Sequence, residues 1–255
     1  MLAKLVKYEL YDLFKSKWVV GLFAFYLLTA FILLYFGKDY TKVLISHNNL
    51  SLITLPLFSL LLSALYFYNN RNFIEFVLTQ PVRRLTLLLS IFISLSLSLS
   101  LSYLFSSLLP FYHFFGFDLA YLRVLLLTTL LVPLFVSLGL FLALLERDRL
   151  KGIGYILLIW LFFSALYDSI LLYFTLVLSD YPIDTFIITL TLMNPIDLIR
   201  LYLLMETGLH EVIGFVGRWL MRYFIYLFPF SLLLSIFYSF LFLMLSVLIF
   251  KRKDF

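Results

Sequence analysis

Long apolar runs without charge alternate with short charged clusters along the whole chain. Each run is long enough to cross a bilayer core of about 30 Å at about 1.5 Å per helical residue. The runs are Trp18–Phe36, Leu50–Tyr68, Leu85–Phe117, Val124–Leu145, Ile153–Ser179 and Tyr223–Phe250. The pattern predicts an all-α integral membrane protein with six transmembrane helices, which form a single transmembrane domain over residues 1–255.

Two stretches on the inner side have helical patterns of their own. Leu2–Lys17 repeats apolar residues at helical spacing with lysines and acids between them, which predicts a helix in the cytoplasmic interface. Asn69–Arg84 holds an apolar cluster around Glu75 and is interrupted by Gln80–Pro81. Because the residue before proline disfavours the helical conformation, we expect a short amphipathic helix that ends there. An interfacial loop is the alternative.

Two segments are predicted on the outer side. Gly37–Asn49 is expected to be a short loop. The outer segment 180–222 is long and too apolar to be disordered, so we expect amphipathic or re-entrant helices before the last span. In it, Thr185–Met193 is expected to dip partly into the membrane, Asn194-Pro-Ile-Asp197 to start a helix, and Leu198–Trp219 to be amphipathic.

The third run contains serine and leucine in strict alternation from Ser94 to Ser102. Such alternation is typical of a strand, but a lone strand in lipid would leave its backbone unpaired, so a helix is favoured. Small residues then fall on two faces, and we expect close helix packing on both. One face carries Ser94, Ser98, Ser102 and Ser106, and the other carries Ser96, Ser100 and Ser107.

Basic residues outnumber acidic ones by 19 to 14, and their positions predict the topology. Thirteen of them fall in four clusters that six spans place on one side, which the positive-inside rule assigns to the cytoplasm together with both termini. The clusters are Lys4/Lys7/Lys15/Lys17, Arg71/Arg83/Arg84, Arg147/Arg149/Lys151 and Lys251/Arg252/Lys253. We therefore interpret the positive charge as topology and headgroup contact, with no role for nucleic acid. The histidines His47, His113 and His210 are predicted to lie outside.

Asp168 is the one carboxylate within an apolar run. It lies about 22 Å into the fifth run at helical rise. A carboxylate near the bilayer centre costs at least about 2.5–3.5 kcal/mol on insertion scales, so it should face the bundle interior or an aqueous cavity. Two interpretations follow: a residue on a substrate or ion path, or an interhelical hydrogen bond to a tyrosine or serine.

The chemistry of an intrinsic enzyme is missing from the sequence. The chain has no cysteine, no G-x-x-x-x-G-K-[ST] phosphate loop and no G-x-S-x-G nucleophile motif. His210-Glu211 lacks the second histidine of a zinc-protease helix. A transporter or channel subunit without enzymatic activity is the natural interpretation.

Several segments resemble one family of permeases. Lys7–Trp18 resembles the interfacial opening of ABC type-2 permeases. Phe73–Arg84, F-I-E-F-V-L-T-Q-P-V-R-R, is similar to the E-L-L-L-x-Q-P-[IV]-x-R segment after the second span of NosY-like permeases, the membrane subunits of nitrous-oxide-reductase maturation. Three further stretches agree in order and spacing: Arg147–Gly152, Trp160 followed by Asp168, and Asn194–Arg200. Many relatives carry an E-R-E-x-G-T-like sequence where this chain has Asn69-Asn-Arg-Asn72.

The resemblance implies a half-transporter in a bacterial or archaeal cytoplasmic membrane. It implies a homodimer with two copies of a separate cytoplasmic ATPase, which would hold ATP and Mg²⁺, and a NosD-like periplasmic partner on the outer face. The family supplies the copper–sulfur centre of nitrous oxide reductase; whether copper, a sulfur species or only mechanical work passes through the permease stays open. Alternatives are an ABC permease that exports lipid, peptide or drug, and a membrane scaffold that anchors a periplasmic protein without transport.

Candidate site residues follow from these expectations. The ATPase-coupling residues are Asn70, Arg71, Phe73, Glu75, Phe76, Gln80, Pro81 and Arg83. The outer partner-facing residues are Asn194, Asp197, Arg200 and Glu206. Weak candidates for Cu(I), which prefers thioether and imidazole ligands, are Met193, Met205, Met221 and His210. Methionines in membrane helices are more often packing residues.

Overall fold

The computed structural model describes residues 2–37, 39–178, 181, 184–209, 217 and 220–252, and these contain helices but no strand. The helices are α1 (Leu2–Lys15), α2 (Lys17–Phe36), α3 (Tyr40–Asn69), α4 (Arg71–Leu78), α5 (Arg84–Phe115), α6 (Leu119–Leu145), α7 (Arg149–Leu161), α8 (Tyr167–Val177), α9 (Asp184–Met193), α10 (Pro195–Glu206) and α12 (Phe224–Arg252). A π-helical turn, η1 (Phe162–Leu166), joins α7 to α8.

Six helical stretches among the described residues are long and apolar enough to cross a membrane: α2, α3, α5, α6, α7–α8 taken together, and α12. The chain is therefore a helical protein with the composition of a multi-pass membrane protein, as predicted. The helices α9 and α10 meet at an angle of 109° and form either a broken span or a re-entrant pair. Helix α10 begins at Pro195 with Asn194 as its cap, where the sequence predicts a helix start.

The predicted outer loop Gly37–Asn49 is wrong, because α3 already begins at Tyr40. The carboxylate of Asp39 caps the helix, since its Oδ1 accepts hydrogen bonds from the backbone N–H groups of residues 41 and 42 at 3.0 and 3.4 Å. His47 and Asn48 are buried within the bundle. His47 therefore does not lie in an exposed outer loop.

Two polar residues near the start of α3 contact side chains of other helices. His47 Nε2 lies 3.5 Å from Oγ of Ser107 on α5. Thr128 on α6 donates a hydrogen bond of 2.7 Å to Oδ1 of Asn48. Because these partners replace water, the polar stretch that the sequence analysis assigned to a loop is instead helical and lies inside the bundle.

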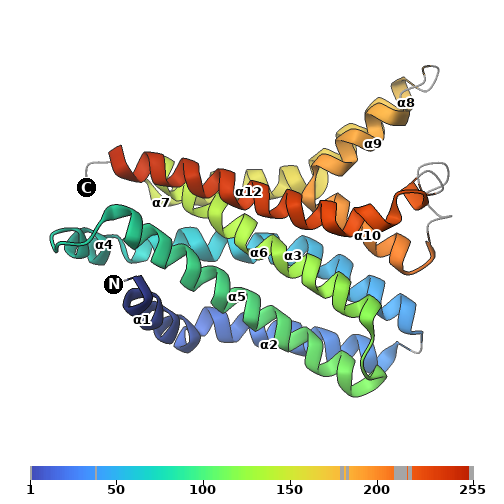
Figure 1. Ribbon diagram of the computed structural model, residues 1–255, viewed down its shortest axis with the longest axis horizontal. Coiled ribbons are helices and arrows are strands. Elements are labelled where there is room, and N and C mark those ends of the chain that lie inside the picture. Colours follow the sequence, from blue (N-terminus) through green and yellow to red (C-terminus); the bar gives the residue numbers. More distant parts are fainter. Residues whose placement is uncertain are drawn as a thin grey trace.

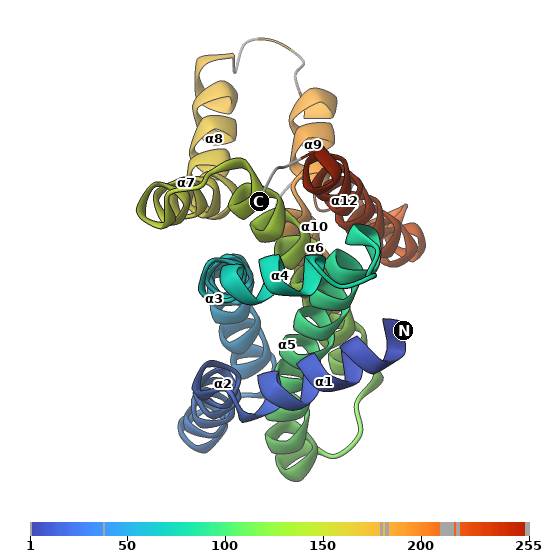
Figure 2. The same cartoon turned by 90° about the vertical axis from the view of Figure 1, so that its left-hand side faces the viewer.

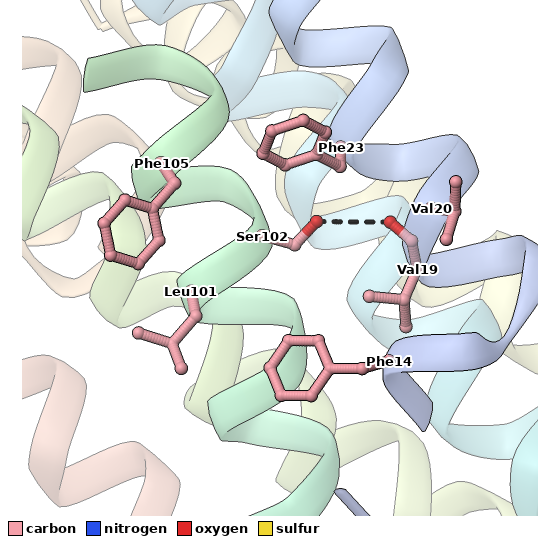
Figure 3. Close-up of a pocket in the computed structure, with 7 residues that line it drawn as sticks. All are labelled: Phe14, Val19, Val20, Phe23, Leu101, Ser102 and Phe105. Atoms are coloured by element: carbon pink, nitrogen blue, oxygen red, sulfur yellow. Dashed lines mark hydrogen bonds between the residues drawn. The ribbon is translucent and has the colours of Figure 1, made fainter. Parts of the chain in front are cut away.

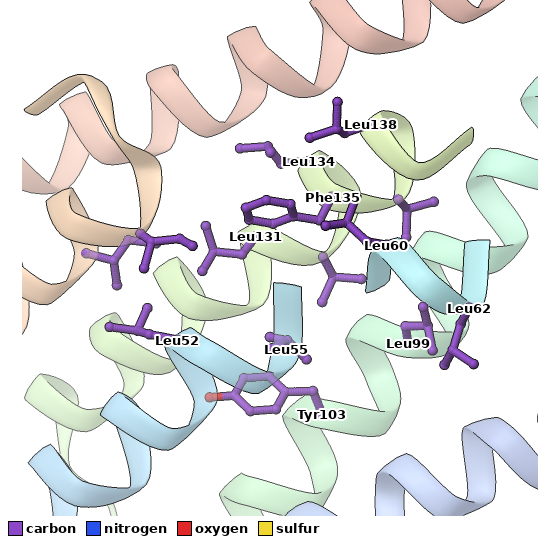
Figure 4. Packing of buried hydrophobic residues seen from close by; sticks show 14 of the residues in the cluster. Leu52, Leu55, Leu60, Leu62, Leu99, Tyr103, Leu131, Leu134, Phe135 and Leu138 are labelled. Carbon is purple, nitrogen blue, oxygen red and sulfur yellow. The ribbon is translucent and has the colours of Figure 1, made fainter. Parts of the chain in front are cut away.

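Helix α6 forms the centre of the bundle and packs against α3, α5 and α12 (Figures 1 and 2). Of its most apolar stretch, 78% is buried, against 11% for α7–α8 and for α12. Leucines and aromatics of α3, α5 and α6 fill the space between these helices, among them Leu55, Tyr103 and Phe135 (Figure 4). Gly139 permits the close approach of α3 and α6: a Cβ there would overlap Oγ of Ser63 and lie 2.7 Å from the Leu60 carbonyl oxygen.

The serine-rich helix α5 is packed on two sides, as its sequence predicts. Ser94, Ser98, Ser102 and Ser106 are all buried, and so are Ser96 and Ser107 on the other face, whereas Ser100 is half-buried. The hydroxyl of Ser102 donates to the carbonyl oxygen of Val19 on α2 at 3.2 Å. Small side chains thus let α5 pack closely against α1 and α2 and also against α6.

One end of the bundle collects α1, α4, the α6–α7 connection and the last turn of α12; we call it the basic end (Figures 1 and 2). Hydrogen bonds join its parts. Arg84 Nη1 donates to the carbonyl oxygens of Phe250 and Lys251 at 3.2 and 3.1 Å. The Tyr68 hydroxyl donates to the carbonyl oxygen of Glu146 at 3.3 Å. The described residues of the four basic clusters lie at this end.

Candidate coupling surface and ion cluster

Helix α4 is a short amphipathic helix held between two spans at the basic end. Asn70 ends α3, where its backbone N–H and its Nδ2 both donate to the Tyr66 carbonyl oxygen at 3.0 and 2.9 Å. Its own carbonyl oxygen accepts the first bond of α4, from Ile74 N–H at 2.9 Å. The helix ends at Leu78, and the Thr79 hydroxyl donates back to the Phe76 carbonyl oxygen at 2.7 Å. The predicted amphipathic helix is confirmed, and the alternative of a loop is wrong.

The two faces of α4 differ sharply. Ile74 and Val77 are buried, and they fix the helix to the bundle. Phe73 and Phe76 are 50% and 63% exposed on the opposite face. Arg71 Nε donates to Glu75 Oε1 at 2.9 Å along the helix, and both side chains are partly exposed. The predicted coupling residues therefore divide into a capping residue, Asn70, an ion pair, and a surface formed by Phe73, Phe76, Gln80, Pro81 and Arg83.

Helix α1 is fixed beside this surface by a carboxylate that the sequence analysis missed. Glu9 is buried against α5, where Ser90 and Ser94 donate to its two carboxylate oxygens at 3.1 and 2.9 Å. Burial raises the pKa of the Glu9 carboxyl above its ordinary value of 4.5, although the hydrogen bonds from Ser94 and Ser90 act in the opposite direction. The sequence placed Glu9 among the polar residues of an interfacial helix, and only the serines on α5 show its role.

A second cluster of polar groups joins the fifth span to α10. Arg200 Nη1 donates to Asp168 Oδ2 at 2.6 Å and to Asp197 Oδ1 at 3.0 Å. Asn194 Nδ2 donates to Asp197 Oδ2 at 2.5 Å and to the Phe163 carbonyl oxygen in η1 at 3.0 Å. We call Asp168, Asn194, Asp197 and Arg200 the ion cluster. Two carboxylates share one guanidinium, and the Asn194 amide links Asp197 to the π-helical turn.

The ion cluster settles the partner of Asp168. The carboxylate is held between helices, as one of the two interpretations expected, but its partner is an arginine and not a tyrosine or serine. The Asp168 and Arg200 side chains remain 42% and 30% exposed, whereas Asp197 is 4% exposed. One side of the cluster therefore faces out of the chain.

The predicted outer partner-facing surface is wrong for three of its four residues. Asn194 and Asp197 are buried in the ion cluster, and the Glu206 side chain is buried against α6. Glu206 accepts from Arg123 Nη1 at 3.3 Å and from the Tyr202 hydroxyl at 2.7 Å. These polar groups pair with one another, and the pairs hold α10 in the bundle. Arg200 alone keeps a partly exposed side chain.

The candidate ligands for Cu(I) occupy different environments. Met205 is buried in α10, whereas Met193 and Met221 are 51% and 39% exposed. His210 lies outside the described residues. Within the part of the chain that the structure describes, no group of three or more His, Asp or Glu side chains is placed to hold a metal ion. A copper site stays a prediction from the sequence.

No protein-family model matches this chain, and no curated protein matches it either.

Proposed function

We propose that this chain is the transmembrane permease subunit of an ABC transporter, and that it works as a homodimer with two copies of a separate cytoplasmic ATPase. The observation that carries the proposal is α4, which presents Phe73 and Phe76 outward between two spans. The sequence has no phosphate loop, so a partner must hydrolyse ATP. The positive-inside rule assigns the basic end, and α4 with it, to the cytoplasm.

The attachment of α4 suits the transmission of force. The helix shares Asn70 with the end of α3 and lies a few residues before the start of α5. Ile74 and Val77 pack it into the bundle, so it cannot swing freely when a partner pushes on its exposed face. A displacement of the ATPase would thus be passed to α3 and α5 as a movement of packed helices.

A second copy of the chain would cover the exposed side of the ion cluster. A charge exposed to hydrocarbon is costly, and the partly exposed Asp168 lies in α7–α8, one of the two least buried spans, where it contacts Arg200 of α10. Contact between two copies through α7–α8 would remove that cost. This supports the homodimer that the family resemblance implies.

The cargo and the outer partner rest on the family resemblance. We propose a NosD-like periplasmic partner at the end opposite the basic end and a role in copper and sulfur delivery for nitrous oxide reductase maturation. Segments Phe73–Arg84 and Asn194–Arg200 support this through their likeness to NosY-like permeases. Export of lipid, peptide or drug would use the same coupling surface, whereas a scaffold would not need it.

The test is to co-express the chain with a cytoplasmic ABC ATPase from the same genome, to co-purify the two and to measure ATP hydrolysis. The double substitution Phe73→Ala/Phe76→Ala should abolish co-purification or lower hydrolysis at least tenfold, because it removes the aromatic face and leaves the buried residues of α4 intact. Phe117→Ala is the matched control, since Phe117 is 76% exposed in the connection at the other end. An unchanged complex with unchanged hydrolysis would overturn the assignment and favour a scaffold.

A further inference from the structure

A cavity of about 310 Å³ lies between α5 and the junction of α1 with α2 (Figure 3). This volume is at the lower end of the range for ligand pockets, about 300–1,000 Å³. We call it the acyl slot, and it is lined by Phe14, Val19, Val20, Phe23, Leu101, Ser102 and Phe105. The hydroxyl of Ser102 is already used, because it donates to the Val19 carbonyl oxygen at 3.2 Å. The lining is therefore suited to hydrocarbon.

The acyl slot opens on the outside of the bundle. Phe14, Val20 and Phe105 are 45%, 54% and 54% exposed, and they come from three different helices. Helices α2 and α5 are both candidate spans, so the opening faces the hydrocarbon of the membrane. Side chains of α1, α2 and α5 bound the slot, whereas an ordinary lipid neighbour touches a convex helix surface.

A basic row on α1 leads to the slot. Lys7 precedes Phe14 by seven residues, about two helical turns, so both lie on nearly the same face of α1. Tyr11 lies between them and holds Lys15, whose Nζ is 4.0 Å from the tyrosine ring centroid. Among the described residues, neither lysine has a carboxylate within 4.0 Å.

The acids of α1 do not neutralise this row. Glu9 is buried and accepts hydrogen bonds from serines of α5. Asp12 lines a separate cleft with Tyr66 and Asn69. The face of α1 that carries the basic row is thus left with uncompensated positive charge next to an apolar slot.

We propose that the acyl slot binds one chain of an anionic phospholipid whose phosphate is held by Lys7 and Lys15. Charge complementarity selects an anionic headgroup, and ammonium–phosphate contacts are charge-assisted hydrogen bonds. The slot selects a lipid chain in place of a soluble phosphate. Such a lipid ties α1 to α2 and α5, and its binding does not depend on any ATPase.

The test uses the purified full chain and native mass spectrometry after graded delipidation. Phosphatidylglycerol and phosphatidylcholine with identical acyl chains are compared. The wild type should retain one phosphatidylglycerol at least tenfold more often than one phosphatidylcholine. Lys7→Gln/Lys15→Gln should remove this preference, and Lys42→Gln, an exposed lysine at the opposite end, should leave it unchanged.

A second arm fills the slot and keeps the charges. Val20→Trp should lower phosphatidylglycerol retention at least tenfold; Leu101→Trp serves in its place if thermal unfolding shows that Val20→Trp does not fold. Equal retention of the two lipids by the wild type would overturn the proposal. Unchanged retention in a folded slot-filling variant would also overturn it, because the lysines would then bind any lipid of the surrounding layer.

Discussion

Substitution of Arg200 by methionine tests whether the ion cluster holds α10 to the fifth span. The guanidinium is the only cation among the described contacts of Asp168 and Asp197. Methionine keeps much of the side-chain volume and removes the charge and the donors. Asp197, 4% exposed, is then left as a buried carboxylate whose described partner is the amide of Asn194.

The magnitude follows from the unequal burial of the two carboxylates. Removal of one partner of a buried ion pair costs about 3–5 kcal/mol. The Asp168 contact is partly exposed and contributes about 1 kcal/mol or less. Allowing for the 30% exposure of Arg200, we expect a total loss of about 2–4 kcal/mol for Arg200→Met. For a chain of this size that corresponds to a fall in Tm of about 5–15 °C.

The assay is thermal unfolding of the purified chain in detergent micelles, followed by circular dichroism. Asp168→Asn should cost about 1 kcal/mol or less, because it leaves the Arg200–Asp197 pair intact. The triple variant Asp168→Asn/Asp197→Asn/Arg200→Met should recover most of the loss, since no unpaired charge remains. The reasoning is refuted if Arg200→Met melts within about 2 °C of the wild type, or if the triple variant melts as low as the single one.

Three further predictions test other contacts. Gly139→Ala should cost about 1–3 kcal/mol of stability through overpacking of α3 against α6, and its Tm should fall. Gly154→Ala, where a Cβ meets nothing within 4 Å, should leave Tm unchanged; equal melting of the two variants would contradict the close approach. Burial raises the pKa of Glu9 above 4.5, so the folded state binds the carboxyl proton more tightly than the unfolded state does. The stability of the fold should therefore fall as pH rises from 4.5 through the raised pKa. Glu9→Gln should remove that part of the pH dependence of Tm. In this cysteine-free chain, Ser169→Cys beside the ion cluster should cross-link to a second copy, and Val20→Cys on α2 should not; monomer from both would argue against the proposed dimer face.

Local patterns predicted α4 correctly because its ends are set within the segment itself. The apolar spacing of Ile74 and Val77 gives one buried face, and the helix ends at Leu78, two residues before Gln80–Pro81. The prediction of close packing along the serines of α5 was correct for the same reason. Small residues at helical spacing allow close packing against any neighbouring helix.

The loop predicted at the start of α3 and the partner-facing residues predicted in the outer segment are wrong, because the polarity of a residue does not show whether its partner is water or another helix. Asn48 pairs with Thr128, 80 residues away, and Asp168 pairs with Arg200, 32 residues away. No periodicity within either segment carries that information. Glu9 shows the same limit, since its partner Ser94 is 85 residues distant.

The sequence by itself determined that this chain is helical and crosses a membrane. The length of each apolar segment and its lack of charge are local properties, and they decide whether that segment is stable in a bilayer. It also determined which polar and charged side chains are available to form hydrogen bonds and ion pairs. Only the tertiary structure decided which of them meet: a carboxylate predicted as a lone acid became one of two that share Arg200, and residues predicted to face a partner became internal ties. The physical reason is that a polar group can be buried at low cost only where a hydrogen-bond partner lies close to it. The packing of the helices decides which groups lie close together.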